Sequence, residues 1–282
     1  RIAYDYGLKS PLTSPEVLTL HRSGAPGAKH ILDACANAGY QWITGHFHAS
    51  RYVPPLKPSN VITFLREPSE RVFSEYLHKK RHNHLGTSFL EYIAQHGNRQ
   101  AKLLSGLSIS SIGFIGLTER YEDSLRLLDY LYGLNLKVRR SNKAPLFSPS
   151  FLKCSAEERV QCRKMNHDDY LLYEEAVKLF DDRIRLMNEN QPIALGWFNR
   201  IESNRLRGQV AWHPRFEHGD HPLSLKIRVN GRAQVWDSNL SDYENIKLDL
   251  ELAPDEELAI EVESTGQLLF RQPVGDPQSD NA

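Results

Sequence analysis

The hydrophobic pattern of this 282-residue chain changes its period near residue 200, and this change restricts the fold more than any other feature. Up to residue 199, short apolar runs alternate with segments whose apolar residues recur every three or four positions. Beyond residue 200, apolar and polar residues alternate one by one, as they do from Leu223 to Val229. Strands alternating with helices indicate a parallel sheet flanked by helices, and successive short strands indicate an antiparallel β-sandwich. We therefore predict an α/β domain over residues 1–199 and a β-sandwich over residues 200–282.

Short apolar runs predict the strands of the first domain, and capping residues predict where its helices begin. The predicted strands cover residues 40–44, 61–65 and 112–115. Four helices are predicted: one capped by Thr87 and Ser88, one capped by Thr118 and closed by Gly133, one that begins at the Ser155–Glu158 capping box, and one that begins after Asn166. Core-facing stripes are expected at Tyr121, Leu125, Leu128 and Tyr132 of the second helix, and at Tyr170, Tyr173, Val177, Phe180, Ile184 and Met187 of the fourth. In the second domain, Asn230-Gly231 predicts a two-residue hairpin turn.

Composition excludes several classes of protein. Basic and acidic residues number 35 each, so the chain lacks the basic field that favours nucleic acid, and no apolar run is long enough for a membrane span. The three cysteines have no spacing typical of a metal site or a disulfide framework, which favours a reducing compartment. Pairing of Cys154 with Cys162 stays open as an alternative, because eight residues can close a loop.

The segment VITFLREPSERVFSEY, residues 61–76, carries the clearest chemical signal. A β-favouring run leads into Arg66, and Pro68 suits the first turn of the helix that bears Ser74. A guanidinium fork, a hydroxyl and the free N–H groups of a helix N-terminus together suit a phosphate group. The alternative is an Arg66 that pairs with Glu67 or Glu70 and a Ser74 that faces solvent.

This segment resembles the 3′-phosphate-binding motif of sulfotransferases, which use 3′-phosphoadenosine 5′-phosphosulfate (PAPS). Further blocks in the family's order are TGHF (44–47), NRQAKLLSG (98–106), IGLTERYEDSLRLLDYLYG (115–133) and DDYLLYEEAVKLF (168–180). Together they resemble carbohydrate sulfotransferases related to the heparan sulfate enzymes and their bacterial relatives. The resemblance implies a P-loop-type parallel sheet, PAPS as co-substrate without a metal, and a carbohydrate or glycan acceptor. It assigns the 3′-phosphate to Arg66 and Ser74.

Two histidines follow the predicted strand at 40–44. His46 matches the histidine of the family's GHF-type motif, which implies the base that accepts the proton of the acceptor hydroxyl. His48 is the second candidate for the base, or a substrate ligand, because strand alternation would point it to the other face. The alternative for either residue is a structural, hydrogen-bonded histidine.

Four more residues are candidates for contact with the nucleotide. Asn98 and Gln100 match the polar positions of the family's N-x-Q block, which lies near cofactor and acceptor; helix capping is the equal alternative. Arg140 and Lys143 occupy the place of a loop that closes over the nucleotide in relatives. A solvated charged face is the alternative for this pair.

The family's Lys-Thr-Gly/Ala-Gly-Thr-type loop, which binds the 5′-phosphosulfate, does not occur in this sequence. GAPGAKH (24–30) does not replace it, because its glycines are too close together and His30 stands where a Ser or Thr is needed. RIAYDYG at the start resembles the helix after that loop, so we expect roughly ten or more preceding residues that supply a strand and the loop.

Three functions remain open from the sequence. The leading one is a PAPS-dependent sulfotransferase, with a cytoplasmic bacterial location favoured over a Golgi-lumen type. The alternative is a non-catalytic nucleotide- and glycan-binding protein with a degenerate sulfotransferase domain. A kinase of related fold is disfavoured, because no magnesium-holding Ser/Thr follows a Lys in a phosphate loop.

Overall fold

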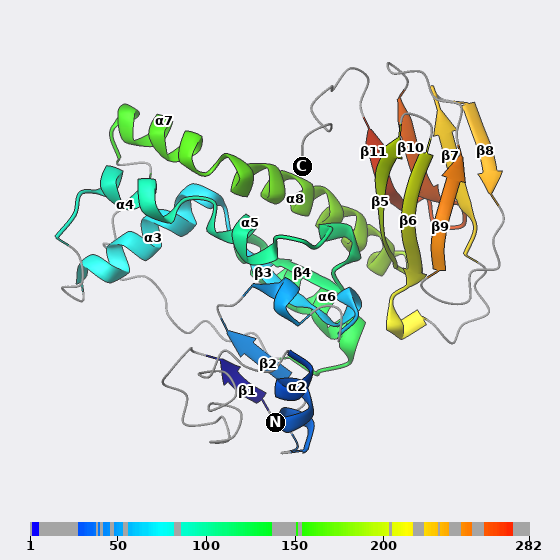
Figure 1. The fold of residues 1–282 in the computed structure, drawn as a ribbon, viewed down its shortest axis with the longest axis horizontal. Coiled ribbons are helices and arrows are strands. Elements are labelled where there is room, and N and C mark those ends of the chain that lie inside the picture. The colour runs from blue at the N-terminus through cyan, green and yellow to red at the C-terminus, as the bar shows by residue number, and fades with distance from the viewer. Residues whose placement is uncertain are drawn as a thin grey trace.

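The structure is a computed structural model, and it describes the chain in the following ranges: 2–5, 28–37, 39, 42–45, 48–52, 56–81, 86–136, 151, 154–202, 205–216, 223–230, 232–236, 244–249 and 257–272. Helices and strands alternate up to residue 188, and strands follow from residue 194 (Figure 1). The protein is a mixed α/β protein with parallel and antiparallel sheets, as the change of period predicts.

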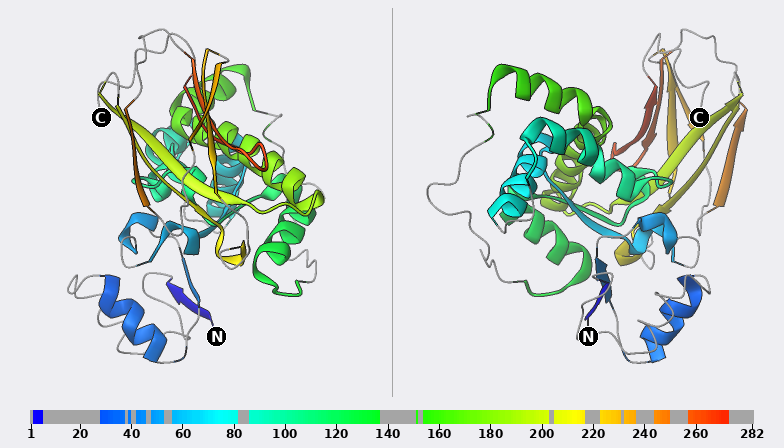
Figure 2. Two further views of the ribbon diagram at one scale, coloured as in Figure 1. Left: turned by 90° about the vertical axis from the view of Figure 1, so that its right-hand side faces the viewer. Right: turned by 60° about the vertical axis from the view of Figure 1, so that its left-hand side comes forward.

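Two pairs of parallel strands form the N-terminal half. Strand β1 (Ile2–Asp5) pairs with β2 (Trp42–Gly45), and β3 (Ile62–Leu65) pairs with β4 (Phe114–Leu117). Strand β1 was expected to be helical; the pairing with β2 makes it a strand instead. Together with helix α2 (Ala28–Asn37), β1 and β2 lie at one end of the molecule (Figures 1 and 2). The two pairs are separate sheets in the described part of the chain.

Six helices accompany β3 and β4 in the described part of the chain; two of them pack against β4, and three others share a separate core. The six helices are α3 (Pro68–Arg81), α4 (Phe89–His96), α5 (Arg99–Leu104), α6 (Tyr121–Tyr132), α7 (Ala156–Met165) and α8 (His167–Asn188). Short 3-10 turns are η1 (Ala49–Arg51), η2 (Pro58–Asn60), η3 (Ile109–Ser111), η4 (Thr118–Arg120) and η6 (Pro214–Phe216). Helix α8 is the longest and runs from the side of α7 toward the C-terminal strands (Figure 1).

The capping signals were correct at three of the predicted helix ends. Ser88 and Ser155 each form a capping box, with Glu91 and Glu158 respectively. Gly133 ends α6 with φ +62°, a left-handed conformation that glycine adopts without strain.

The prediction that Thr118 caps a helix is wrong. Its hydroxyl donates to the Leu65 carbonyl at 3.0 Å, which joins the ends of β3 and β4, and α6 begins only at Tyr121. The predicted stripe of α6 is partly confirmed, because Leu128 is buried and Tyr132 packs partly buried against the same core. The other buried residues of the helix are Ser124, Leu127 and Leu131.

The core-facing stripe of α8 is largely confirmed, because Phe180 is buried and four of its other members, Tyr173, Val177, Ile184 and Met187, pack partly buried against the same core. The remaining buried positions of the helix, which the stripe did not include, are Asp169, Ala176, Arg183 and Leu186. Apolar periodicity misses charged residues that have internal partners. Asp169 accepts from the Ala101 N–H at 2.8 Å, and Arg183 donates to the Ile112 carbonyl at 3.0 Å, so both can be buried.

Two antiparallel sheets form the C-terminal β region, which we define as residues 194–272. One has the order β5-β6-β9 and the other β11-β10-β7-β8. The strands are β5 (Ala194–Glu202), β6 (Arg205–Trp212), β7 (Leu225–Val229), β8 (Arg232–Trp236), β9 (Glu244–Asp249), β10 (Leu258–Val262) and β11 (Leu268–Gln272). Buried residues of both sheets share one apolar cluster. Val229 opposes Arg232 and Asn230 has φ +46°, so the predicted hairpin between β7 and β8 is confirmed, while Gly231 lies outside the described residues.

The two parts of the chain meet without a linker. Ile193 belongs to the core around β4 and α8, and Ala194 begins β5 and belongs to the core of the C-terminal β region. Phe216 packs against both cores. The predicted division between residues 199 and 200 therefore falls inside β5, and the architecture changes at Ala194. The periodicity gave a later position because a period of two becomes evident only some residues into the strand.

Candidate functional site

The candidate site lies where the parallel strands β3 and β4 end. Leu65 opposes Leu117 in the register, so both strands finish at one level. Arg66 and Glu67 follow β3, and Glu119 follows β4. Ligands of open α/β sheets bind at the carboxyl ends of strands, and this edge carries both cationic and anionic side chains.

Arg66 directly precedes the N-terminus of α3. Pro68 is the first residue of that helix, and Glu67 caps it by accepting the Glu70 N–H at 2.7 Å. The Arg66 guanidinium lies 3.7 Å from the Glu70 carboxylate, and these side chains are 36% and 38% exposed. An exposed, loosely paired arginine is weakly bound, so an anion can displace Glu70 from it.

Ser74 lies one helical turn beyond Glu70 on the same flank of α3, and it is half-buried. Arg66 precedes the helix by two residues, so the helical spacing relates Glu70 to Ser74 and does not by itself fix the position of the guanidinium relative to the hydroxyl. The ion pair with Glu70 is the alternative named for Arg66, whereas Ser74 is half-buried and does not face solvent, so phosphate binding by Arg66 and Ser74 stays a prediction.

Asn98 and Gln100 make contacts within the fold. Asn98 has φ +56°, and its Oδ1 accepts the N–H groups of Asp168 and Asp169 at 3.1 and 3.3 Å, at the start of α8. The Gln100 amide hydrogen-bonds to the backbone of Arg66. The capping alternative therefore describes Asn98, and Gln100 contacts the strand end that carries Arg66.

Two carboxylates with tyrosine partners also lie at this edge, and of these the sequence suggested only Glu67, as an ion-pair partner of Arg66. The Tyr170 hydroxyl donates to Glu67 at 2.7 Å, and the Tyr173 hydroxyl donates to Glu119 at 2.9 Å. Glu119 also accepts the Glu67 N–H at 2.9 Å. Burial raises the pKa of Tyr170 to about 12, and it also raises the pKa of Tyr173, so both hydroxyls remain donors. The position of each glutamate just after a strand was the available signal.

A half-buried ionic network fixes α3 against α5 and α8. Arg71 contacts Glu75 at 2.9 Å and approaches Asp169 at 3.7 Å, and Arg99 contacts Glu75 at 2.5 Å. Burial raises the pKa of Asp169. Burial also acts to raise the pKa of Glu75, but Arg99 and Arg71 outweigh it and the net shift is downward. The network holds the helix that carries Ser74.

Of the remaining candidates, the structure describes His48 alone. His48 is exposed and directly precedes η1. His46, Arg140 and Lys143 lie outside the described residues. Within the ranges that the structure describes, no group of three or more His, Cys, Asp or Glu side chains could hold a metal ion.

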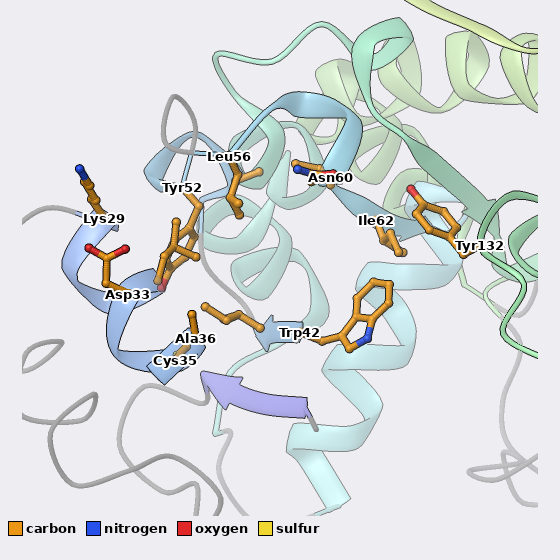
Figure 3. A pocket seen from close by; sticks show the side chains of 14 residues that line it. Lys29, Asp33, Cys35, Ala36, Trp42, Tyr52, Leu56, Asn60, Ile62 and Tyr132 are labelled. Carbon is orange, nitrogen blue, oxygen red and sulfur yellow. The ribbon is translucent and has the colours of Figure 1, made fainter. Parts of the chain in front are cut away.

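A cavity of about 910 Å³ lies between the two parallel strand pairs (Figure 3). Trp42 and Ile43 of β2 and Ile62 of β3 line it, together with residues of α2 that include Lys29 and Asp33. The Trp42 ring meets the Tyr132 ring edge to face at 6.2 Å. The cavity is largely apolar and does not include Arg66 or Ser74, so it is separate from the candidate anion site.

No known protein family, curated protein or solved structure matches this chain in the comparisons. No helix in the described part of the chain is long and apolar enough to cross a membrane. All three cysteines are free, so Cys154 and Cys162 do not pair.

Proposed function

We propose that this protein is a PAPS-dependent sulfotransferase that transfers the sulfuryl group to a hydroxyl of a carbohydrate or glycan. The observation that carries the proposal is the position of Arg66. Its guanidinium is half-exposed, stands at the N-terminus of α3 and has a single loose ion pair with Glu70 in the described structure. A 3′-phosphate at this position would meet the guanidinium, the Ser74 hydroxyl and the positive end of the helix.

The proposal includes a finer interpretation of the fold. We interpret the two parallel pairs as parts of one P-loop-type sheet, because a two-stranded pair is marginal by itself. The two antiparallel sheets, with their common core, we interpret as an accessory β-sandwich.

The remaining roles follow from the resemblance. His46 would accept the proton of the acceptor hydroxyl, with His48 as the second candidate. Arg140 and Lys143 would close over the nucleotide. No metal takes part in this scheme. The free, largely buried cysteines are compatible with the proposed cytoplasmic location.

The decisive experiment compares two nucleotides by calorimetry: adenosine 3′,5′-bisphosphate and adenosine 5′-phosphate. The wild-type protein should prefer the bisphosphate, and Arg66→Ala should lose roughly 2 to 4 kcal/mol of that affinity, because a charge-assisted contact is removed. Arg126→Ala is the matched control, since Arg126 is also exposed and paired to a neighbouring carboxylate. Equal affinities of wild type and Arg66→Ala, or a preference for ATP, would refute the assignment.

A non-catalytic nucleotide- and glycan-binding protein is the second candidate. It is favoured by the sequence itself, in which the family's Lys-Thr-Gly/Ala-Gly-Thr-type loop does not occur. Transfer from PAPS to a panel of glycans separates the two. In an enzyme, His46→Ala should lower the rate by roughly a hundredfold to ten-thousandfold while bisphosphate affinity is kept, and His48→Ala should do less. Bisphosphate binding without transfer to any glycan would support the binding protein.

A further inference from the structure

Gln100 makes two hydrogen bonds to the residue proposed to bind the phosphate. Its Oε1 accepts the Arg66 N–H at 2.9 Å, and its Nε2 donates to the Arg66 carbonyl at 2.9 Å. The side chain is in the first turn of α5, and the residue is 8% exposed. Both polar atoms of the amide are thus used on the backbone of Arg66.

These two hydrogen bonds continue the backbone pairing of β3 at the residue where its pairing with β4 has ended. The ladder between β3 and β4 ends at Leu65, so Arg66 is the first residue beyond it. A side-chain amide that donates and accepts like a neighbouring peptide group fixes the orientation of the Arg66 backbone. The backbone orientation in turn sets the direction in which the guanidinium leaves the strand.

The turn that carries Gln100 is itself anchored. Asn98 donates to the Asp168 carboxylate at 2.7 Å, and the Ala101 N–H donates to the Asp169 carboxylate at 2.8 Å. Residues on both sides of Gln100 are therefore joined to the first turn of α8. The amide is held between a rigid helix start and the strand end.

We propose that Gln100 is a positioning residue, which acts on the 3′-phosphate through Arg66 and does not contact the ligand. This inference rests on the proposed function and deepens it. It assigns the glutamine a part in the preference for a nucleotide that bears a 3′-phosphate.

The test uses Gln100→Met, which keeps the length of the side chain and removes both hydrogen bonds. Gln267 offers a matched control, because its amide binds the backbone of Ala194 in the same way, with bonds of 2.7 and 2.8 Å, and it is 1% exposed. Both variants should lose stability. Only Gln100→Met should lower the ratio of affinities for adenosine 3′,5′-bisphosphate and adenosine 5′-phosphate, by about tenfold, a coupling typical of residues in contact. An unchanged ratio in Gln100→Met would overturn the inference.

A double variant tests whether the effect passes through Arg66. In the Arg66→Ala background, Gln100→Met should lower the ratio no further. A full additional loss would overturn the inference and indicate direct contact of Gln100 with the phosphate. If the wild type binds the two nucleotides equally well, the proposed function and the inference both fail. If the wild type prefers the bisphosphate and Gln100→Met keeps the wild-type ratio of affinities, only the inference fails.

Discussion

Replacement of His213 should remove a large part of the loss of stability in acid. His213 is 1% exposed at the end of β6, where its ring meets the Tyr132 ring at 5.2 Å. Burial, and to a smaller extent the charges of Arg183 and Arg215, lower the pKa of His213 from 6.5 to about 3. The folded protein therefore keeps this histidine neutral, whereas the unfolded chain protonates it below pH 6.5.

The sign and the size follow from proton linkage. Between pH 6.5 and about pH 3, His213 is protonated in the unfolded chain but neutral in the folded protein. Proton uptake then favours unfolding, so the free energy of unfolding is unaffected by His213 above pH 6.5 and decreases as the pH falls below 6.5. The slope approaches about 1.4 kcal/mol per pH unit, and the loss from about pH 7.5 to about pH 4.5 is about 2.7 kcal/mol for this one group.

Urea unfolding followed by tryptophan fluorescence at several pH values measures this contribution. In His213→Gln, the fall in unfolding free energy over that range should be smaller than in the wild type by the amount given above, because glutamine does not titrate. His167→Gln is the control, since His167 is exposed at the start of α8 and should leave the wild-type slope unchanged. The same pH slope in His213→Gln and in the wild type would refute the reasoning.

Two further predictions concern the anion site and the junction. Glu70→Gln should tighten the binding of adenosine 3′,5′-bisphosphate several-fold, because it removes the carboxylate that competes for Arg66. Calorimetry measures this affinity, and Glu174→Gln is the control because Glu174 is an exposed glutamate on α8. Weaker binding in Glu70→Gln would contradict the prediction. A chain that ends at Asn199 should bind more of an apolar dye and aggregate more than a chain that ends at Ile193, because it leaves the first part of β5 without its partner β6. Equal dye binding and aggregation of the two chains would show that the unpaired strand does not promote aggregation.

Local sequence signals were sufficient to predict those features that depend on interactions between residues close together in the chain. The capping boxes at Ser88 and Ser155 and the left-handed turn at Gly133 depend on neighbouring residues alone. The strand before Arg66 and the hairpin between β7 and β8 follow equally from local propensity. For the same reason the sequence could indicate that Arg66 and Ser74 lie on either side of a helix N-terminus.

The tertiary structure decided everything that depends on partners distant in the chain. Thr118 could not be recognised as a bridge to Leu65, nor Gln100 as a partner of the Arg66 backbone, because such bonds join residues 34 to 53 positions apart. Charged Asp169 and Arg183 are buried because backbone groups elsewhere satisfy them, and apolar periodicity does not register such pairs. The junction at Ala194 is likewise visible only in the tertiary structure. The sequence shows the period of the apolar residues, but it does not show that Ile193 and Ala194 belong to different cores.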